Sequence, residues 1–293
     1  MRALVLSGGG ALGAYEAGAI SILCEAFDYD LVCGTSIGAL NAAFVAQRRL
    51  DDLREVWATI GEAKVVTLDP LAQRIRDFAA AVMSFQKDNG MLQKAIALAG
   101  LYPAYRRIGP MSAVLSMLGG LSPDPIAAVL AKYLDFGRLA RSIVVSGTNL
   151  TTGGSDAFCW FPDAASGARF AAVHDKGLTH PLSEQNFRDA VRASSAIPFA
   201  FAPVLVEASG GDALAFVDGG VANNTPLGVA IDAGATEVTV VFLNPVDRHT
   251  TQAVANLAEI GLTCFSIMQE RILELDFKDA QRVNDDIAKN SGG

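Results

Sequence analysis

The amino-acid sequence predicts an α/β fold with a central, mostly parallel sheet. Three observations support this prediction. Short apolar runs that suit β-strands alternate with segments of helical periodicity, which is the order of elements in α/β proteins. Apolar residues make up 51% of the 293 residues, which excludes an intrinsically disordered chain and fits one large domain. Three glycine-containing loops each follow a predicted strand.

The predicted strands are short apolar runs, most of them bounded by glycine or by polar residues. In chain order they are Ala3–Ser7, Leu31–Cys33, Ser142–Thr148, Ala157–Phe161, Pro203–Val206, Ala213–Val217 and Glu237–Leu243. The Gly/Ser-rich stretch Ser209–Asp212 is short, so it predicts a tight connection between the fifth and sixth strands.

The predicted helices lie between these strands and after the last one. They are Ala11–Phe27, Ile37–Gln47, Asp51–Ile60, Glu184–Ala193, Leu227–Ala233 and much of Val254–Ile287. The third helix has Asp51 and Asp52 in its first turn, where acidic side chains interact favourably with the positive end of the helix dipole.

Composition and charge exclude several classes of protein. The formal charge of −8 argues against nucleic acid as a partner, because phosphate contacts require a basic face. The longest uncharged run, Leu31–Gln47, is too short and too polar to span a membrane, and no signal peptide is visible. The four cysteines form no CxxC pair, which indicates buried thiols in a reducing compartment rather than disulfides or metal ligands. We therefore expect a cytoplasmic globular protein without a transmembrane helix.

We expect one domain over residues 1–245, with a helical insertion at about 71–121, and a C-terminal helical extension, 246–293, that packs on the same domain. The segment Leu71–Leu121 shows no clear strand and carries six basic residues against two acidic ones. One interpretation is a set of core-packing helices with a solvated basic face. The other is a lid or cap that contacts membranes peripherally, because basic amphipathic stretches with aromatic residues bind lipid interfaces.

The first glycine loop is Ser7-Gly8-Gly9-Gly10-Ala11-Leu12-Gly13, after the first predicted strand. Consecutive glycines let backbone N–H groups approach a ligand closely, and the following helix points its positive end toward them. Such a loop binds a phosphate or an oxyanion. Its spacing also satisfies the dinucleotide-binding pattern GxGxxG, so the loop alone leaves both chemistries open.

The second loop, Gly34-Thr35-Ser36-Ile37-Gly38, has the pattern GxSxG between a predicted strand and an apolar helix. That is the context of a nucleophile elbow, in which a strained turn exposes the serine hydroxyl. A serine that merely caps the helix is the alternative.

The third loop, Asp218-Gly219-Gly220, ends another predicted strand and leaves a carboxylate in a tight space. An ordinary Asx turn is the alternative for this loop.

Two catalytic classes fit the loops poorly. A dinucleotide site requires an acidic residue at the end of the second strand, but Asp28 and Asp30 precede that strand. An α/β-hydrolase orders its triad as serine, acid and histidine, and only His249, in a polar stretch, follows Asp218. The elbow also comes after only two strands, which is early for that fold. A histidine-free Ser–Asp dyad fits better.

Together the three loops resemble the motifs of the patatin-like phospholipases. Gly8–Gly13 matches the oxyanion loop of that family, Gly34–Gly38 its nucleophile elbow and Asp218–Gly220 its catalytic acid, and Ala193–Pro198 and Asp218–Pro226 fit as supporting stretches. The resemblance covers about residues 3–245. The sequence departs from many members at Ser7, where they carry Asp, and at Leu12, where they carry a basic residue. These departures leave the backbone donors of the loop in place.

The resemblance implies a three-layer α/β/α fold and a lipid acyl hydrolase of the phospholipase A or lysophospholipase type. Ser36 would form an acyl-enzyme and Asp218 would act as its base. The oxyanion hole would comprise Gly8, Gly9 and Gly10, and the loops would be shaped by Gly13, Gly34, Gly38, Gly219 and Gly220. The expected substrate is a lipid or another acyl ester, with no metal and no cofactor. A Ser–Asp–His esterase and a catalytically silent lipid-binding module stay open as alternatives.

Overall fold

The structure is a computed structural model. It describes residues 1–60, 67–68, 121–122, 124–175, 177–198, 200–207, 213–243 and 257–290. Most of the expected insertion at 71–121 therefore lies outside the described residues. The short strands β3 (Thr67–Leu68) and β4 (Leu121–Ser122) pair antiparallel. Leu68 and Leu121, which precede and end the expected insertion, are therefore neighbours in the structure.

An eight-stranded sheet forms the centre of the described structure, with strands in the order β10-β1-β2-β5-β6-β7 and with β8 and β9 off this path. The strands are β1 (Arg2–Leu6), β2 (Leu31–Thr35), β5 (Ser142–Asn149), β6 (Ser155–Trp160), β7 (Thr179–Pro181), β8 (Val204–Glu207), β9 (Ala213–Asp218) and β10 (Glu237–Val241). The four strands β10, β1, β2 and β5 run parallel, and β6 runs antiparallel to β5. The prediction of a mostly parallel central sheet is confirmed.

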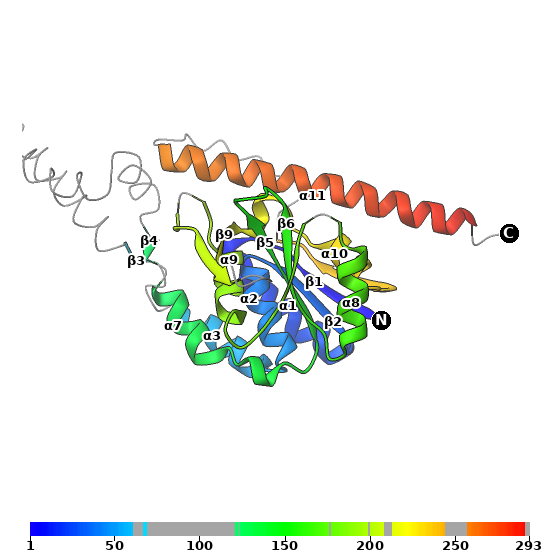
Figure 1. Ribbon diagram of the computed structural model, residues 1–293, viewed down its shortest axis with the longest axis horizontal. Coiled ribbons are helices and arrows are strands. Elements are labelled where there is room, and N and C mark those ends of the chain that lie inside the picture. Colours follow the sequence, from blue (N-terminus) through cyan, green and yellow to red (C-terminus); the bar gives the residue numbers. More distant parts are fainter. Residues whose placement is uncertain are drawn as a thin grey trace, which may run out of the picture.

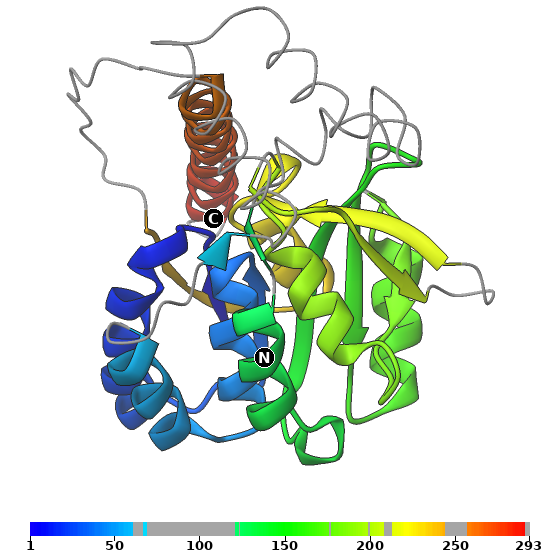
Figure 2. The ribbon, with the colours of Figure 1, turned by 90° about the vertical axis from the view of Figure 1, so that its left-hand side faces the viewer.

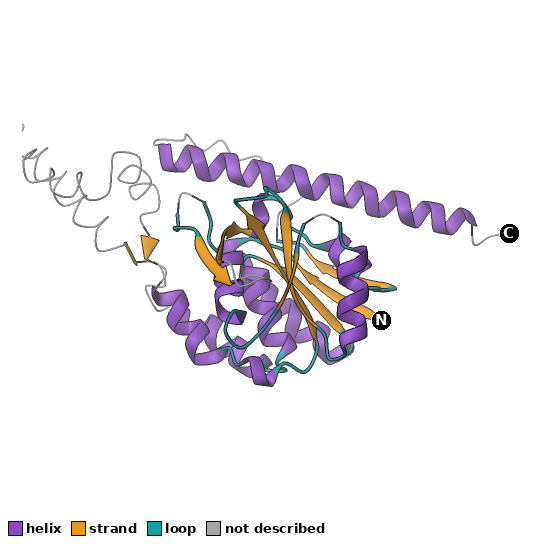
Figure 3. Cartoon of the chain, viewed as in Figure 1, coloured by secondary structure: helices purple, strands orange, loops and turns teal. Residues whose placement is uncertain are grey.

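Helices cover both faces of this sheet, which makes three layers (Figures 1 and 3). Alternate residues of β1 and β2 enter two separate cores, as the period of two in a strand requires. One core is shared with α1 (Gly13–Ala26), α2 (Ile37–Ala46), α3 (Leu50–Ile60), α7 (Asp124–Tyr133) and α9 (Phe187–Ser194). The other core is shared with α8 (Ala164–Val173) and α10 (Leu227–Asp232).

The most enclosed helix is α2, which carries nine buried residues out of ten. It packs between the sheet and helices α1, α3 and α9. Many of its residues are alanines, and small side chains let neighbouring elements approach closely. The start of α2 is therefore held rigidly at the end of β2.

The long helix α11 (Leu257–Asn290) lies across the top of the body and ends beyond it, as Figure 1 shows from the side and Figure 2 nearly end-on. It meets the body at the 3₁₀ turn Gly219–Val221, which directly follows β9. Phe265 on its inner side is buried, whereas Ile267 and Met268 are exposed. No helix among the described residues is long and apolar enough to cross a membrane.

The described helices α7 and α8, the strand β7 and the two-residue strands β3 and β4 have no counterpart in the sequence-based prediction. Helix α8 contains a glycine, Gly167, and begins where the Asp163 carboxylate accepts a hydrogen bond from the N–H of Ser166. Strand β7 has only three residues and includes Pro181. The predicted strands and helices that lie in the described part of the chain are present, with ends that differ by a few residues.

Candidate active site

Ser36 occupies a sharp turn between β2 and α2. Its backbone angles are φ 56° and ψ −126°, a left-handed conformation that side-chain-bearing residues rarely adopt. A Cβ atom on Gly34 would lie 2.6 Å from the Gly38 carbonyl carbon, and one on Gly38 would lie 2.8 Å from the Ser7 carbonyl oxygen. Glycine is therefore required on both sides of Ser36, because the backbone passes too close for any side chain.

Asp218 reaches Ser36 because β2 and β9 meet end to end along the same edge of β5. Thr35, the last residue of β2, pairs with Ser146, while Asp218, the last residue of β9, pairs with the next residue, Gly147. The Ser36 hydroxyl donates a hydrogen bond to Asp218 Oδ2 over 2.6 Å. Both residues are buried, Ser36 with 4% and Asp218 with 0% of its surface exposed.

The surroundings of Asp218 hold its carboxyl group in place and alter its charge. Its Oδ1 atom accepts a hydrogen bond from the N–H of Gly220 over 2.7 Å. Burial raises the pKa of Asp218 to about 7, and the hydrogen bonds from Ser36 and Gly220 oppose this rise. A carboxyl group with this pKa exists near neutral pH in both its charged and its neutral form, so it can accept a proton and also return it.

Gly219 shows why glycine follows the aspartate. A Cβ atom there would lie 2.9 Å from Thr35 Cγ2 and equally close to the Ser146 carbonyl carbon. The chain leaving β9 therefore passes directly over the ends of β2 and β5. This close passage brings the carboxyl group of Asp218 into contact with the serine.

The glycine loop after β1 lies against the serine. A Cβ atom on Gly8 would come within 3.0 Å of Ser36 Cβ. The N–H of Gly8 donates to the Asn224 carbonyl over 3.0 Å, so this donor is already bonded within the protein. In the described part of the chain, the N–H groups of Gly9 and Gly10 have no protein acceptor. Gly10 has φ 57°, so the loop turns through a backbone conformation that favours glycine.

Gly13 begins α1, and a Cβ atom there would lie 2.5 Å from Trp57 Cζ2. This glycine therefore allows α1 to pack closely against α3.

Two groups of residues to which the sequence assigned no role also contact the site. The Asn224 amide donates to the Gly8 carbonyl over 3.3 Å and accepts a bond from Gln269 of α11 over 3.1 Å. Ser194 and Ser195 both hydrogen-bond to the backbone of Ser36. The only sequence signal for either group is that Ala193–Pro198 and Asp218–Pro226 match stretches of the family named above.

The histidines of the described part are paired elsewhere. His174 Nδ1 lies 3.0 Å from Asp232 Oδ2, and His180 Nε2 lies 2.9 Å from Asp156 Oδ2. Both imidazoles are therefore bonded to aspartates other than Asp218. His249 lies outside the described residues. The hydroxyl of Ser36 bonds directly to the carboxylate of Asp218, without an imidazole between them.

Cysteine and metal chemistry is not evident in the described structure. All four cysteines are free. Cys33 and Cys159 are buried as expected, whereas Cys24 is only partly buried and Cys264 is exposed, so the expectation of buried thiols is wrong for these two. Burial raises the pKa of the Cys159 thiol to about 11. The described residues contain no group of three or more His, Cys, Asp or Glu that could hold a metal ion.

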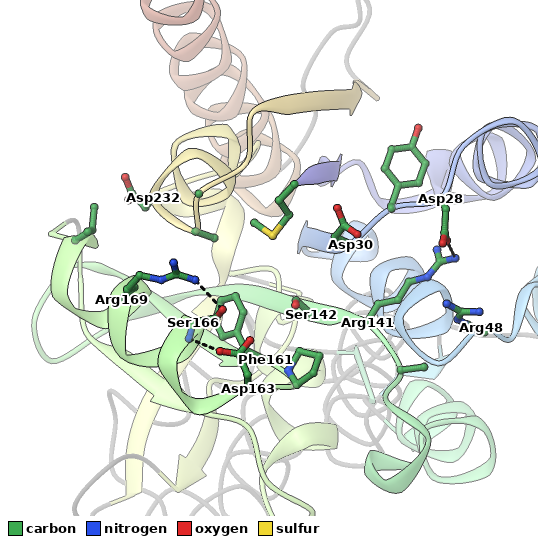
Figure 4. Close-up of a pocket in the computed structure, with 17 residues that line it drawn as sticks. Asp28, Asp30, Arg48, Arg141, Ser142, Phe161, Asp163, Ser166, Arg169 and Asp232 are labelled. Atoms are coloured by element: carbon green, nitrogen blue, oxygen red, sulfur yellow. Dashed lines mark hydrogen bonds and ion pairs between the residues drawn. The ribbon is translucent and has the colours of Figure 1, made fainter.

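A cleft of about 640 Å³ lies at the edge of the sheet opposite to the Ser36–Asp218 site, where the parallel strands begin (Figure 4). Several of its charged groups bond to one another or to neighbouring elements. Arg141 forms an ion pair with Asp28, and Asp232 bonds to His174. None of the residues of the three glycine loops lines this cleft, whereas these loops meet at the Ser36–Asp218 site.

Comparison with known proteins gives one family. The family model described as patatin-like phospholipase matches residues 4–231, a range that contains all three glycine loops. Among solved structures, VipD from Legionella pneumophila is similar, with 17% sequence identity and a TM-score of 0.42. That match covers 82% of this chain and 49% of the VipD chain, so it spans about half of VipD. No curated protein sequence matches significantly.

Proposed function

Because this chain belongs to the patatin-like phospholipase family, we propose that it hydrolyses lipid acyl esters with Ser36 as nucleophile and Asp218 as its general base. The family supports lipid acyl hydrolysis in general. The observation that carries the finer proposal is the bond of 2.6 Å between Ser36 Oγ and Asp218 Oδ2 in a buried setting.

In the first step, Ser36 Oγ attacks the carbonyl carbon of the ester and Asp218 Oδ2 takes the hydroxyl proton. The pKa of about 7 makes Asp218 a stronger base than an ordinary aspartate while leaving a large ionised fraction at neutral pH. The protonated carboxyl then donates its proton to the departing alcohol. Water attacks the resulting acyl-enzyme, again giving its proton to Asp218, and Ser36 leaves with that proton as the acid is released.

The negative oxygen formed during attack requires donors that are not already bonded. Within the described residues, the N–H groups of Gly9 and Gly10 meet this requirement, while Gly8 shapes the loop and keeps it against Ser36. The loss of one oxyanion donor typically raises the barrier by roughly 3–4 kcal/mol. We therefore assign the oxyanion role to the backbone of the glycine loop.

The dyad can be tested with a soluble p-nitrophenyl acyl ester. Ser36→Ala is expected to abolish hydrolysis and labelling by a fluorophosphonate probe, which requires an activated serine. Asp218→Asn keeps the shape of the side chain but removes the base, so kcat should fall by about 10²- to 10⁴-fold. His249→Ala is the matched control and should keep most of the activity.

Two results would redirect this proposal. If His249→Ala is as inactive as Ser36→Ala while still folded, a Ser–Asp–His triad replaces the dyad. If folded wild-type protein supplemented with detergent is neither active nor labelled at Ser36, a lipid-binding module without catalysis or a gated enzyme replaces the proposal. If the wild type is active, total lipid extract incubated with wild type and with Ser36→Ala identifies the head group and the acyl position that is cleaved.

We also propose that the basic segment 71–121 contacts membranes that contain anionic lipid. Each basic side chain near such a surface contributes about 1 kcal/mol of attraction. Reversal of both Arg106 and Arg107 to Glu should therefore weaken binding to phosphatidylserine vesicles by roughly 10-fold or more, as measured by sedimentation. Arg48→Glu, outside the basic segment and in the cleft shown in Figure 4, is the control and should bind normally. Unchanged vesicle binding by the double variant would contradict the proposal.

A further inference from the structure

We propose that the segment Ser194–Ala196, at the end of α9, positions both members of the dyad through their backbones. The two serine hydroxyls hold the peptide groups on either side of Ser36, and the Ala196 carbonyl holds the N–H of Asp218. This inference rests on the proposed function, in which Ser36 is the nucleophile and Asp218 is its base.

Ser194 holds the peptide nitrogen of Ser36. Its hydroxyl donates to the Ser146 carbonyl over 2.6 Å, and the same oxygen accepts the N–H of Ser36 over 2.9 Å. A hydroxyl has one proton, so donation to Ser146 leaves only its lone pairs for Ser36 and fixes the direction of both bonds. Ser194 is fully buried, so water does not compete for this bond. The N–H of Ser36 is consequently unavailable to an oxyanion.

Ser195 holds the peptide oxygen of Ser36. Its hydroxyl lies 3.0 Å from the Ser36 carbonyl and 3.1 Å from the Val191 carbonyl, so one proton is shared between the two acceptors. The Ser36 carbonyl also accepts the N–H of Ala39, which begins the hydrogen-bond ladder of α2. The peptide group after Ser36 is therefore held from two directions.

These bonds act where the backbone is strained. The φ of 56° is unfavourable for serine, and such a conformation persists only where its surroundings enforce it. Rotation of this backbone would swing the Ser36 hydroxyl away from Asp218. The hydroxyls of Ser194 and Ser195 bond directly to the two peptide groups that such a rotation would move.

Ala196 extends the same segment to the other member of the dyad. Its carbonyl accepts the N–H of Asp218 over 2.9 Å, and the Asp218 carbonyl accepts the Thr148 hydroxyl over 2.9 Å. Three consecutive residues therefore bond to the backbones of both the nucleophile and the base. This arrangement fixes the separation of two residues that are 182 positions apart in the sequence.

The alternative is that these serines only satisfy the end of a helix. Ser21 of α1 provides a matched control, because its hydroxyl bonds to the Ala17 carbonyl four residues earlier, as the Ser195 hydroxyl does to Val191. Ser21 makes no bond to the dyad. Ser21→Ala thus removes the local helix bond and a bond from Arg54 Nε, neither of which involves the dyad. Ser195→Ala removes the local bond together with the bond to Ser36.

The test measures kcat and KM on a p-nitrophenyl acyl ester, the rate of fluorophosphonate labelling, and thermal unfolding. Ser194→Ala and Ser195→Ala should each lower kcat and the labelling rate, by up to about 100-fold, with KM unchanged, since a small misplacement of a reacting group has an effect of this size. Ser194→Thr, which keeps the hydroxyl, should retain more activity than Ser194→Ala. Ser21→Ala should keep the wild-type kcat.

The outcomes separate this inference from the proposed function. If both alanine variants fold and keep the wild-type kcat and labelling rate, the inference is wrong while the dyad stands. A purely structural role would lower the unfolding temperature and leave kcat of the folded protein unchanged, which would also overturn it. If Ser194→Ala does not fold, Ser195→Ala, whose side chain is only half-buried, decides the question. If the wild type itself is inactive and unlabelled, the proposed function fails first.

Discussion

As the proposed base, Asp218 must satisfy two conflicting requirements. It must contact the Ser36 hydroxyl in a space without water, yet burial disfavours the charge that makes it a base. The structure combines both, because the N–H of Gly220 and the hydroxyl of Ser36 compensate the buried carboxylate only in part. The outcome is a pKa of about 7 for a side chain whose usual value is 3.8.

This value predicts the pH dependence of the reaction. The base is active in its ionised form, so kcat/KM on a soluble ester should rise with pH through about 7 and level off above it. A pH–rate profile on a single preparation, with circular dichroism at each pH as the control for folding, measures this. A profile that is flat between pH 5 and 8.5 would show that Asp218 is not the group that titrates.

The main elements follow from short-range patterns in the sequence. The alternation of apolar runs and helical segments predicts the α/β class, and the GxSxG spacing predicts a turn at the end of β2. Helix α8 and strand β7 are harder to predict, because Gly167 weakens a helical pattern and Pro181 weakens that of a strand that is already short.

Some residues of the candidate site can likewise be predicted from a local sequence pattern, and others cannot. Ser36 and Asp218 lie in recognisable loops, so both can be selected from the sequence. Ser194, Ala196 and Asn224 act through bonds that form only once α9, β9 and the glycine loop are packed together. No local pattern in the sequence encodes these contacts.

The close packing of α2 on β1 can be tested by comparing two glycine-to-alanine variants. A Cβ atom on Gly38 would clash with the backbone of β1, so Gly38→Ala should lower the free energy of unfolding by roughly 1–3 kcal/mol. Gly18 lies exposed within α1 with no atom near its Cβ position. Gly18→Ala should raise the free energy of unfolding by about 0.5–1 kcal/mol. Urea denaturation measures both, and equal stability of the two variants would contradict the close approach.

Acidic groups inside the protein make its overall stability depend on pH. Burial raises the pKa of Glu16 to about 8, with the Asn41 amide opposing the rise, and raises that of Asp218 to about 7. In the unfolded chain both carboxyls ionise near pH 4. The folded protein therefore holds more protons than the unfolded chain between about pH 4 and pH 8, and the free energy of unfolding should fall as pH rises through this range.

The size of this decrease is at most about 1.4 kcal/mol per pH unit for each proton involved. Glu16→Gln keeps an acceptor for Asn41 and removes the titrating group, so it should stabilise the protein at pH 8.5 and change little at pH 4.5. Asp218→Asn should do the same while losing activity. Urea denaturation at several pH values measures both effects. If the free energy of unfolding changes with pH in the same way for wild type and for Glu16→Gln, burial does not raise the pKa of Glu16 in the folded protein.

The end-to-end meeting of β2 and β9 along β5 also affects synthesis of the chain. The ribosome releases Ser36 long before Asp218, and β5 must already be in place for the second strand to arrive opposite the first. A nascent chain therefore carries a serine without its base and lacks the pairing that would bring the two together. The bond between Ser36 and Asp218, on which the proposed hydrolysis depends, can therefore form only after translation has passed β9.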